Sequence, residues 1–255
     1  MELLYQQWKT MGAAGDHLTL WQSFFVKFYQ AFIEGGRWKQ YLEGVGSTLY
    51  VTAMALVIGV FLGIIVAVVR TAHDQQRVGH RNVVLGVVNW ICKLYTTIIR
   101  GTPMMVQLLV MGLVIFSNSR NFAMVGALTL GINSGAYVAE IVRSGLMSVD
   151  PGQMEAGRSL GMNYFDTMRL VVIPQAIKNI LPALGNEFIT LLKDTSLISV
   201  IGGKELVYAA RGVITRTYES MFPLLGSAVI YLALVMIFSW LQSKLERRLR
   251  QSDRH

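Results

Sequence analysis

The sequence contains few residues of the kinds that build disulfide, metal and catalytic sites. Among its 255 residues are one cysteine, four histidines and five prolines. The single cysteine, Cys92, excludes an internal disulfide, and its place in an apolar run predicts a small buried thiol. The histidines lack the spacing of metal ligands, so we expect no metal site. No serine or histidine belongs to a nucleophile–base pattern, and we therefore expect no enzymatic activity.

Charged residues are also scarce, at 15% of the chain against roughly 25% in an average soluble domain. Hydrophobic residues make up 53% and form long runs, which predicts a membrane protein with several spans. The net charge of +8 does not indicate a nucleic-acid partner. The basic residues lie at the span ends and in the C-terminal tail, as the positive-inside rule describes.

A phosphate-binding loop of the form G-x-x-x-x-G-K-[ST] is missing as well. Gly203-Lys204-Glu205 supplies only a fragment of it. We therefore expect no cofactor on this chain, and any ATP would be bound by a partner subunit. No repeat or low-complexity segment divides the sequence, so we expect an N-terminal segment over 1–43, one membrane domain over 44–245 and a basic tail over 246–255.

The N-terminal segment has no basic start followed by a continuous apolar core, and we expect it not to be a signal peptide. Its aromatic residues recur at helical spacing, at Trp21, Phe24, Phe25, Phe28 and Phe32. This spacing predicts an amphipathic helix. Such a helix can lie at the membrane interface or pack on the bundle, and the sequence does not choose between the two.

The apolar runs predict an all-α, polytopic bundle of about five transmembrane helices. The expected spans are 48–69, 103–117, 122–142, 175–201 and 222–241. The loop after the first span holds Arg70, Arg77 and Arg81 against one acid, Asp74, which places it in the cytoplasm. Five crossings then put the N-terminus outside, and the 143–174 loop and the C-terminus in the cytoplasm.

Residues 83–117 are too many for one straight span, because 35 residues at ~1.5 Å each exceed a hydrocarbon core of ~30 Å. The break is expected at Arg100-Gly101-Thr102-Pro103, where proline can open a new helix. We expect 83–99 to lie partly in the interface or against the bundle, and 103–117 to cross the membrane. Further on, Glu140 and Arg143 have the spacing of an i, i+3 ion pair, which we favour over a ligand role.

The longest polar interval of the chain, 150–174, predicts two short helices. The first is framed by Pro151 and ends near Gly161, a residue suited to the left-handed conformation after a helix. The second opens at Asn163 as N-cap and runs to Ile173, where Pro174 interrupts it. A connector between spans needs only a few polar residues, so this helix pair indicates a function.

This interval resembles the cytoplasmic EAA loop of the permeases of ATP-binding cassette (ABC) importers. Its pattern, E-A-A, three residues, G, nine residues and I-x-L-P, reads here Glu155-Ala156-Gly157, Gly161 and Val171-Val172-Ile173-Pro174. Three positions depart conservatively: Gly157 for the second alanine, Val171 for isoleucine and Ile173 for leucine. Residues 100–107, 136–145 and 191–197 also resemble permeases for polar amino acids.

The resemblance implies a type I importer fold in a bacterial cytoplasmic (inner) membrane, working by alternating access. It implies a dimer of ABC ATPases, a second permease, identical or homologous, and an extracytoplasmic solute-binding protein as partners. The coupling residues toward the ATPase would be Glu155, Ala156, Gly157, Leu160, Gly161 and Pro174. Thr102 and Gln107, in the stretch that resembles amino-acid permeases, would line the substrate path.

The expected fourth span is unusually polar. It carries three charges, Glu187, Lys193 and Asp194, together with Asn186, Thr190, Thr195 and Ser196. Each charge at bilayer depth costs at least ~2.5–3.5 kcal/mol, so these residues should face a cavity or one another. Glu187 and Asp194 are seven residues apart and share one helix face, about 10 Å apart. Two carboxylates would suit arginine, lysine or histidine. A purely structural role stays open, as do glutamine, glutamate and cystine as substrates.

Two other classes of function are weighed against the importer. An ion-coupled secondary amino-acid transporter would use Glu187 or Asp194 as its cation or proton site, but it leaves the 150–174 helix pair unexplained. A membrane-embedded scaffold would bind no solute, which the polar fourth span disfavours.

Overall fold

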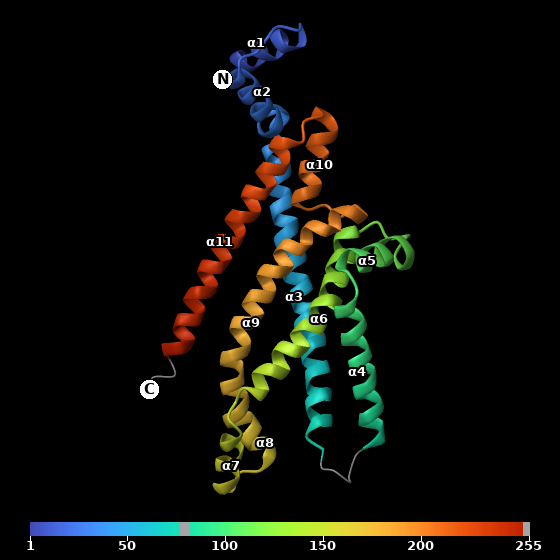
Figure 1. The fold of residues 1–255 in the computed structure, drawn as a ribbon, viewed down its shortest axis with the longest axis vertical. Coiled ribbons are helices and arrows are strands. Elements are labelled where there is room, and N and C mark those ends of the chain that lie inside the picture. The colour runs from blue at the N-terminus through green and yellow to red at the C-terminus, as the bar shows by residue number, and fades with distance from the viewer. Residues whose placement is uncertain (77–81, 252–255) are drawn as a thin grey trace.

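The computed structural model describes residues 1–76 and 82–251, and within them every regular element is a helix (Figure 1). The elements are α1 Glu2–Ala13, α2 Leu20–Phe32, η1 Glu34–Gly36, α3 Trp38–Asp74, α4 Val83–Gly101, α5 Met104–Leu109, η2 Val110–Ile115, α6 Phe122–Met147, α7 Pro151–Ser159, α8 Tyr164–Thr167, η3 Met168–Val172, α9 Ile173–Asp194, η4 Thr195–Ile201, α10 Leu206–Thr217 and α11 Met221–Gln251. The all-α prediction is confirmed. Arg77 and Arg81, two of the three arginines from which the loop after the first span was predicted to be cytoplasmic, lie outside the described residues.

Four of the described helices, α3, α4, α6 and α11, have the length and apolar composition of membrane spans. The expected fourth span begins as α9, which has 22 residues but is more polar than these four. Nevertheless α9 packs against α6, α3 and α11, and five long helices make up the bundle (Figure 1). Cys92 is buried between α3, α4 and α6, as its apolar surroundings predict.

The helix lengths contradict the prediction that 103–117 is the crossing segment, although 83–99 does pack against the bundle, one of the two expected arrangements. The chain does break at Thr102–Pro103, which are extended. However, the apolar helix after the break, Met104–Ile115, has 12 residues, and at ~1.5 Å each these span only about 18 Å. The 19 residues of α4 reach about 28 Å, close to the thickness of the hydrocarbon core. By length and composition α4, and not the helix after the break, fits a membrane span.

The centre of the bundle is the contact between α3 and α6, which rests on small residues. Gly59 and Gly63 on α3, and Gly131 and Gly135 on α6, repeat at four-residue spacing. A Cβ atom on Gly63 would lie 2.5 Å from Cγ1 of Val138, and one on Gly131 would lie 2.7 Å from the side chain of Ile58. Only glycine permits this approach, which is the usual way in which helices pack closely in a membrane.

The N-terminal segment packs on the bundle, one of the two arrangements left open. Phe24 of the expected amphipathic helix, α2, lies edge-on against Phe222 of α11 with 5.0 Å between ring centroids. Lys27 forms an ion pair with Glu219 at 3.0 Å. The preceding helix α1 was not predicted. It is held by the stacking of Tyr5 on Tyr29, with 4.3 Å between centroids.

Different short helices lie at the two ends of the bundle. α7 and α8 lie at the end where α3 ends and α4 begins, and α1, α2 and α10 lie at the other (Figure 1). The 37 residues of α3, far more than the predicted 48–69, extend along the bundle between these ends. At ~1.5 Å per residue α3 is about 55 Å long, so it projects beyond a ~30 Å hydrocarbon core.

Candidate functional site

The helix pair at one end of the bundle forms from local signals. Asp150 caps α7, its carboxylate accepting a hydrogen bond from the Gly152 N–H at 2.7 Å. Gly161 then takes a left-handed conformation with φ +77°, which ends the helix. Asn163 caps α8 by accepting from the Asp166 N–H at 2.8 Å. These helix starts and the turn at Gly161 are confirmed predictions.

Glycine at position 157, where the importer pattern has alanine, follows from the packing of α7 on α8. A Cβ atom on Gly157 would lie 2.5 Å from Cγ2 and 2.8 Å from Oγ1 of Thr167. Thr167 is fully buried, and its hydroxyl donates to the Asn163 carbonyl at 2.9 Å. The two short helices therefore touch through a glycine and a threonine.

The expectation that Pro174 interrupts the second helix is wrong. The π-helical η3 follows α8 directly, and α9 begins at Ile173 with Pro174 in its first turn. The wider π turn lets the chain pass the proline without a break. The helix pair and the polar α9 are thus one continuous helical path.

The outer surface of the helix pair is exposed. Glu155, Ala156, Leu160 and Gly161 are all exposed, and Leu160 is 82% exposed. The inner side is tied to the bundle, because the Tyr164 hydroxyl donates to the Gln75 side chain at the end of α3. The helix pair is therefore anchored on one side and exposes a leucine on the other, which suits the binding of a protein partner.

The candidate path residues meet around the middle of α6. The Ser134 hydroxyl donates to the Glu187 carboxylate of α9 at 2.7 Å. On the other side, the Asn133 amide donates to the Gln107 side chain at 3.0 Å. Gln107 in turn donates to the Thr102 hydroxyl at 2.8 Å. Successive residues of α6 therefore hold Glu187 on one side and the Thr102–Gln107 pair on the other.

The remaining polar residues of the expected fourth span, in α9 and η4, are mostly used within the fold. Asn186 accepts a hydrogen bond from Gln242 of α11 at 2.9 Å, and the Thr190 hydroxyl donates to the Asn186 carbonyl at 3.1 Å. Thr195 is buried and donates to the Leu192 carbonyl. These contacts join α9 to α11 and stabilise its end.

Lys193 and Asp194 are different, because neither side chain forms a hydrogen bond or ion pair with any described residue. Lys193 is exposed and lines a hollow of about 310 Å³ together with Ser196 and Tyr231. Asp194 is half-buried on a neighbouring face. As expected, the two adjacent charges do not form an ion pair with each other. Glu187 and Asp194 share no bridging side chain among the described residues.

The expected ion pair between Glu140 and Arg143 is wrong. Glu140 pairs with Arg70 of α3, and Nη1 of Arg100 lies 3.9 Å from the same carboxylate. Arg143 instead pairs with Asp74 at 3.0 Å. Charged residues on the neighbouring helices α3 and α4 compete with the residue one turn away on α6 for each charge. Burial between the helices favours these interhelical ion pairs. The guanidinium of Arg100 also lies over the Tyr137 ring, 5.3 Å from its centroid.

One buried acid was missed by the sequence analysis. Glu205 is 1% exposed and caps α10, accepting from the N–H groups of Val207 and Tyr208 at 2.7 Å each. It also accepts from the Tyr231 hydroxyl of α11 at 2.9 Å. Burial raises the pKa of the Glu205 carboxyl, although these three donors oppose the rise. An acid directly before the apolar Leu206 was the available signal for a helix cap.

Residues 79–251 match the family described as binding-protein-dependent transport system inner membrane component, over more than half of the chain. The chain belongs to this family. It is thus a permease, the membrane subunit of an ABC transporter, and is not itself an ATPase. Membership implies an ATPase and a solute-binding protein as partners, and a multi-pass place in the inner membrane.

The permease has curated relatives over most of its length. It is 35% identical over 217 residues to the arginine transport system permease protein ArtQ of Bacillus subtilis (strain 168), covering 83% of this chain and 93% of the relative. It is 32% identical over 213 residues to the glutamine transport system permease protein GlnP of Escherichia coli (strain K12), covering 82% and 92%.

Solved structures share the fold. A crystal structure of an amino acid ABC transporter with histidines has a TM-score of 0.73 and 42% identity, covering 82% of this chain and 94% of that one. An inward-facing methionine ABC transporter, MetNI, has a TM-score of 0.72 at 18% identity, covering 86% and 99%. The type I importer fold is therefore shared by this permease, and amino-acid transport is the activity named for its relatives.

Proposed function

We propose that this permease forms the translocation path of an ABC importer for polar amino acids and couples it to the ATPase through α7. The observation that carries the proposal is the exposed helix pair, fastened to α3 at Tyr164 and continuous with α9 through η3. Leu160 and Glu155 are among the exposed residues that α7 offers to a groove of the ATPase.

The coupling follows from this connection. Closure of an ATPase dimer would draw the α7 helices of two permeases together. Because α8, η3 and α9 form one helical path, that movement reaches Glu187 on α9 and its Ser134 partner on α6. A shift of α9 against α6 would then change the side from which the polar residues are reached, as alternating access requires.

Glu187 supports a cationic substrate such as arginine. Its carboxylate accepts a hydrogen bond from a serine and forms no ion pair with a described residue. A charge at this depth is favourable only with a partner, and a guanidinium or ammonium would supply one. The relatives named for arginine and for glutamine keep neutral polar amino acids among the candidates. Lys193 and Asp194 are further candidates for the path.

We place the N-terminus outside and the C-terminus in the cytoplasm, because α7 must meet a cytoplasmic ATPase and an odd number of crossings separates the termini. The second permease is an identical or homologous copy. ATP is bound by the ATPase alone.

The test is uptake of labelled arginine and glutamine into proteoliposomes that contain the permease, its ATPase and its binding protein. We expect uptake only when ATP reaches the ATPase side. ATP-dependent uptake of glutamine alone would keep the importer and reassign Glu187 to the architecture. Uptake that ignores ATP and follows an ion gradient would overturn the proposal in favour of an ion-coupled transporter.

A further inference from the structure

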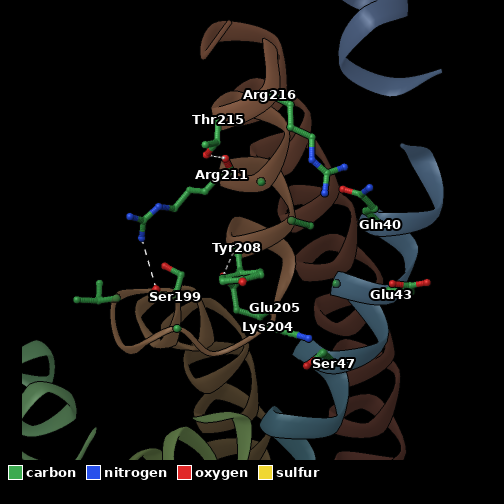
Figure 2. Close-up of a pocket in the computed structure, with 15 residues that line it drawn as sticks. Gln40, Glu43, Ser47, Ser199, Lys204, Glu205, Tyr208, Arg211, Thr215 and Arg216 are labelled. Atoms are coloured by element: carbon green, nitrogen blue, oxygen red, sulfur yellow. Dashed lines mark hydrogen bonds between the residues drawn. The ribbon is translucent and has the colours of Figure 1, made fainter. Parts of the chain in front are cut away.

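A polar cleft of about 720 Å³ opens at the end of the bundle opposite α7 (Figures 1 and 2). One wall is the first part of α3, with Gln40, Glu43 and Ser47, which lie on successive turns. The other wall is α10 and the segment before it, with Lys204 and Arg216. Under the proposed topology this is the extracytoplasmic end, where a substrate arrives.

The two cationic side chains on the α10 wall are directed at α3. Figure 2 shows the Arg216 guanidinium and the Gln40 amide pointing toward each other, with Lys204 reaching toward Ser47. Neither Arg216 nor Lys204 forms a side-chain hydrogen bond or ion pair with another described residue. Both side chains are exposed at the cleft, and their charges have no partner within residues 1–76 and 82–251. A charge-assisted hydrogen bond to a ligand would satisfy each.

The other charges of the lining are differently placed. Arg211 points away from α3, toward the Ser199 carbonyl, to which it donates at 3.4 Å (Figure 2). Glu205 is used by the N–H groups of α10 and by Tyr231. Glu43 is directed away from Arg216 (Figure 2). The gap between α3 and α10 is therefore lined by donors: a guanidinium, an ammonium, an amide and a hydroxyl.

This donor set and this size indicate a small carboxylate. A guanidinium binds a carboxylate through two parallel N–H bonds, and a lysine adds a point charge. Clefts of about 300–1,000 Å³ are typical of small-molecule sites, whereas a protein partner needs about 800 Å² of surface on each side. A single amino acid fits such a cleft.

We propose that this cleft is an outer amino-acid site, separate from the path at Glu187, in which Arg216 and Lys204 bind the α-carboxylate of the substrate. The inference rests on the proposed function, because it takes the ligand to be the transported amino acid. Gln40 and Ser47 on α3 complete the donor set. Glu43 belongs to the same wall as Gln40 and Ser47, with its carboxylate directed away from this donor set (Figure 2).

The test is equilibrium binding of labelled arginine and glutamine to the permease–ATPase complex in nanodiscs, without the binding protein. We expect Arg216→Gln and Lys204→Gln each to raise the half-saturating concentration about tenfold, as loss of one charge-assisted hydrogen bond predicts. Arg211→Gln is the matched control, with the same loss of charge on the same helix, and should stay within about twofold.

A competitor reports on the carboxylate directly. The amide derivative of the bound amino acid lacks that charge. It should compete for the wild-type site about tenfold more weakly than the acid does, and for the site in Arg216→Gln as well as the acid does. Glu187→Gln, which changes the inner path, should leave this ratio unchanged. A fold defect in a variant would lower binding of acid and amide together and would not remove the preference.

Three results would overturn the inference. One is an affinity for the labelled amino acid in both Arg216→Gln and Lys204→Gln that equals that of the wild type. Another is an equal effect of Arg211→Gln, which would show general attraction of anions. The third is a cleft variant that binds the free amino acid as the wild type does but takes up less of it from the loaded binding protein. That result would make the cleft a docking surface for the binding protein. Failure of ATP-driven uptake by the wild type would instead refute the proposed function, and the binding measurements would still decide whether the cleft holds a carboxylate.

Discussion

The contact between Gly157 and Thr167 allows a quantitative prediction about coupling. Gly157→Ala restores the residue of the importer pattern, yet its Cβ would lie 2.5 Å from Cγ2 of Thr167. Carbon atoms in contact sit about 3.5–4.0 Å apart, so α7 must move by roughly 1 Å or Thr167 must rotate. Rotation would break the hydrogen bond of the Thr167 hydroxyl to Asn163. Overpacking of this kind costs about 1–3 kcal/mol.

We expect Gly157→Ala to lower ATP-driven uptake in proteoliposomes about tenfold while membrane insertion is unchanged, because a displaced α7 no longer fits its partner. Thr167→Ala removes the two nearest atoms and leaves only its Cβ, 3.2 Å away, so the double variant should recover most of the activity. Gly86→Ala on α4 is the control, since its Cβ would meet nothing within 4 Å. Wild-type uptake by Gly157→Ala, or no rescue by Thr167→Ala, would refute the reasoning.

Three further predictions test other parts of the permease. Glu155→Lys should abolish uptake while the ATPase still hydrolyses ATP and the permease still inserts, and ATP-driven uptake at the wild-type rate would count against the coupling role of α7. Glu187→Gln keeps an acceptor for Ser134 but loses the charge, so in competition assays we expect the preference for arginine over glutamine to fall about tenfold; an unchanged ratio would make Glu187 structural. Burial raises the pKa of Glu205 in the folded state, so its contribution to stability is fully present below the unfolded pKa of about 4.3 and is lost as the pH rises through the folded pKa. The thermal unfolding temperature of the purified complex should therefore fall with rising pH more steeply in the wild type than in Glu205→Gln. Parallel curves of unfolding temperature against pH would exclude this role.

The parts of the fold that follow from short-range signals were predictable. The caps at Asp150 and Asn163, the turn at Gly161 and the break before Pro103 each depend on a few neighbouring residues, and all are present. In the helix pair the sequence pattern and the geometry agree. One error arose here, at Pro174, because a proline reads the same whether it ends a helix or opens one.

Contacts between distant segments were not predictable in the same way. Glu140 has an arginine three residues away, but its partners come from α3 and α4, and no local pattern shows which helix will lie nearest. The choice of α4 as a span depends on the lengths of the two helices, which become known only when their ends are placed at Gly101 and Ile115. The glycines of α3 and α6 acquire meaning only when the two helices are known to touch. Glu205 was missed because its three donors are brought together by α10 and α11.

The length of α3 has a mechanical consequence. Its first turns form a wall of the outer cleft, its last turn is tied to α8 through Gln75, and its middle is clamped on α6 at Gly59 and Gly63. A rod about 55 Å long that is held at its centre acts as a seesaw, and a tilt of about 5° moves each end by roughly 2.4 Å in opposite directions. One rigid helix can therefore carry a small displacement made by the ATPase to the mouth of the permease, with the close glycine contact as its fulcrum.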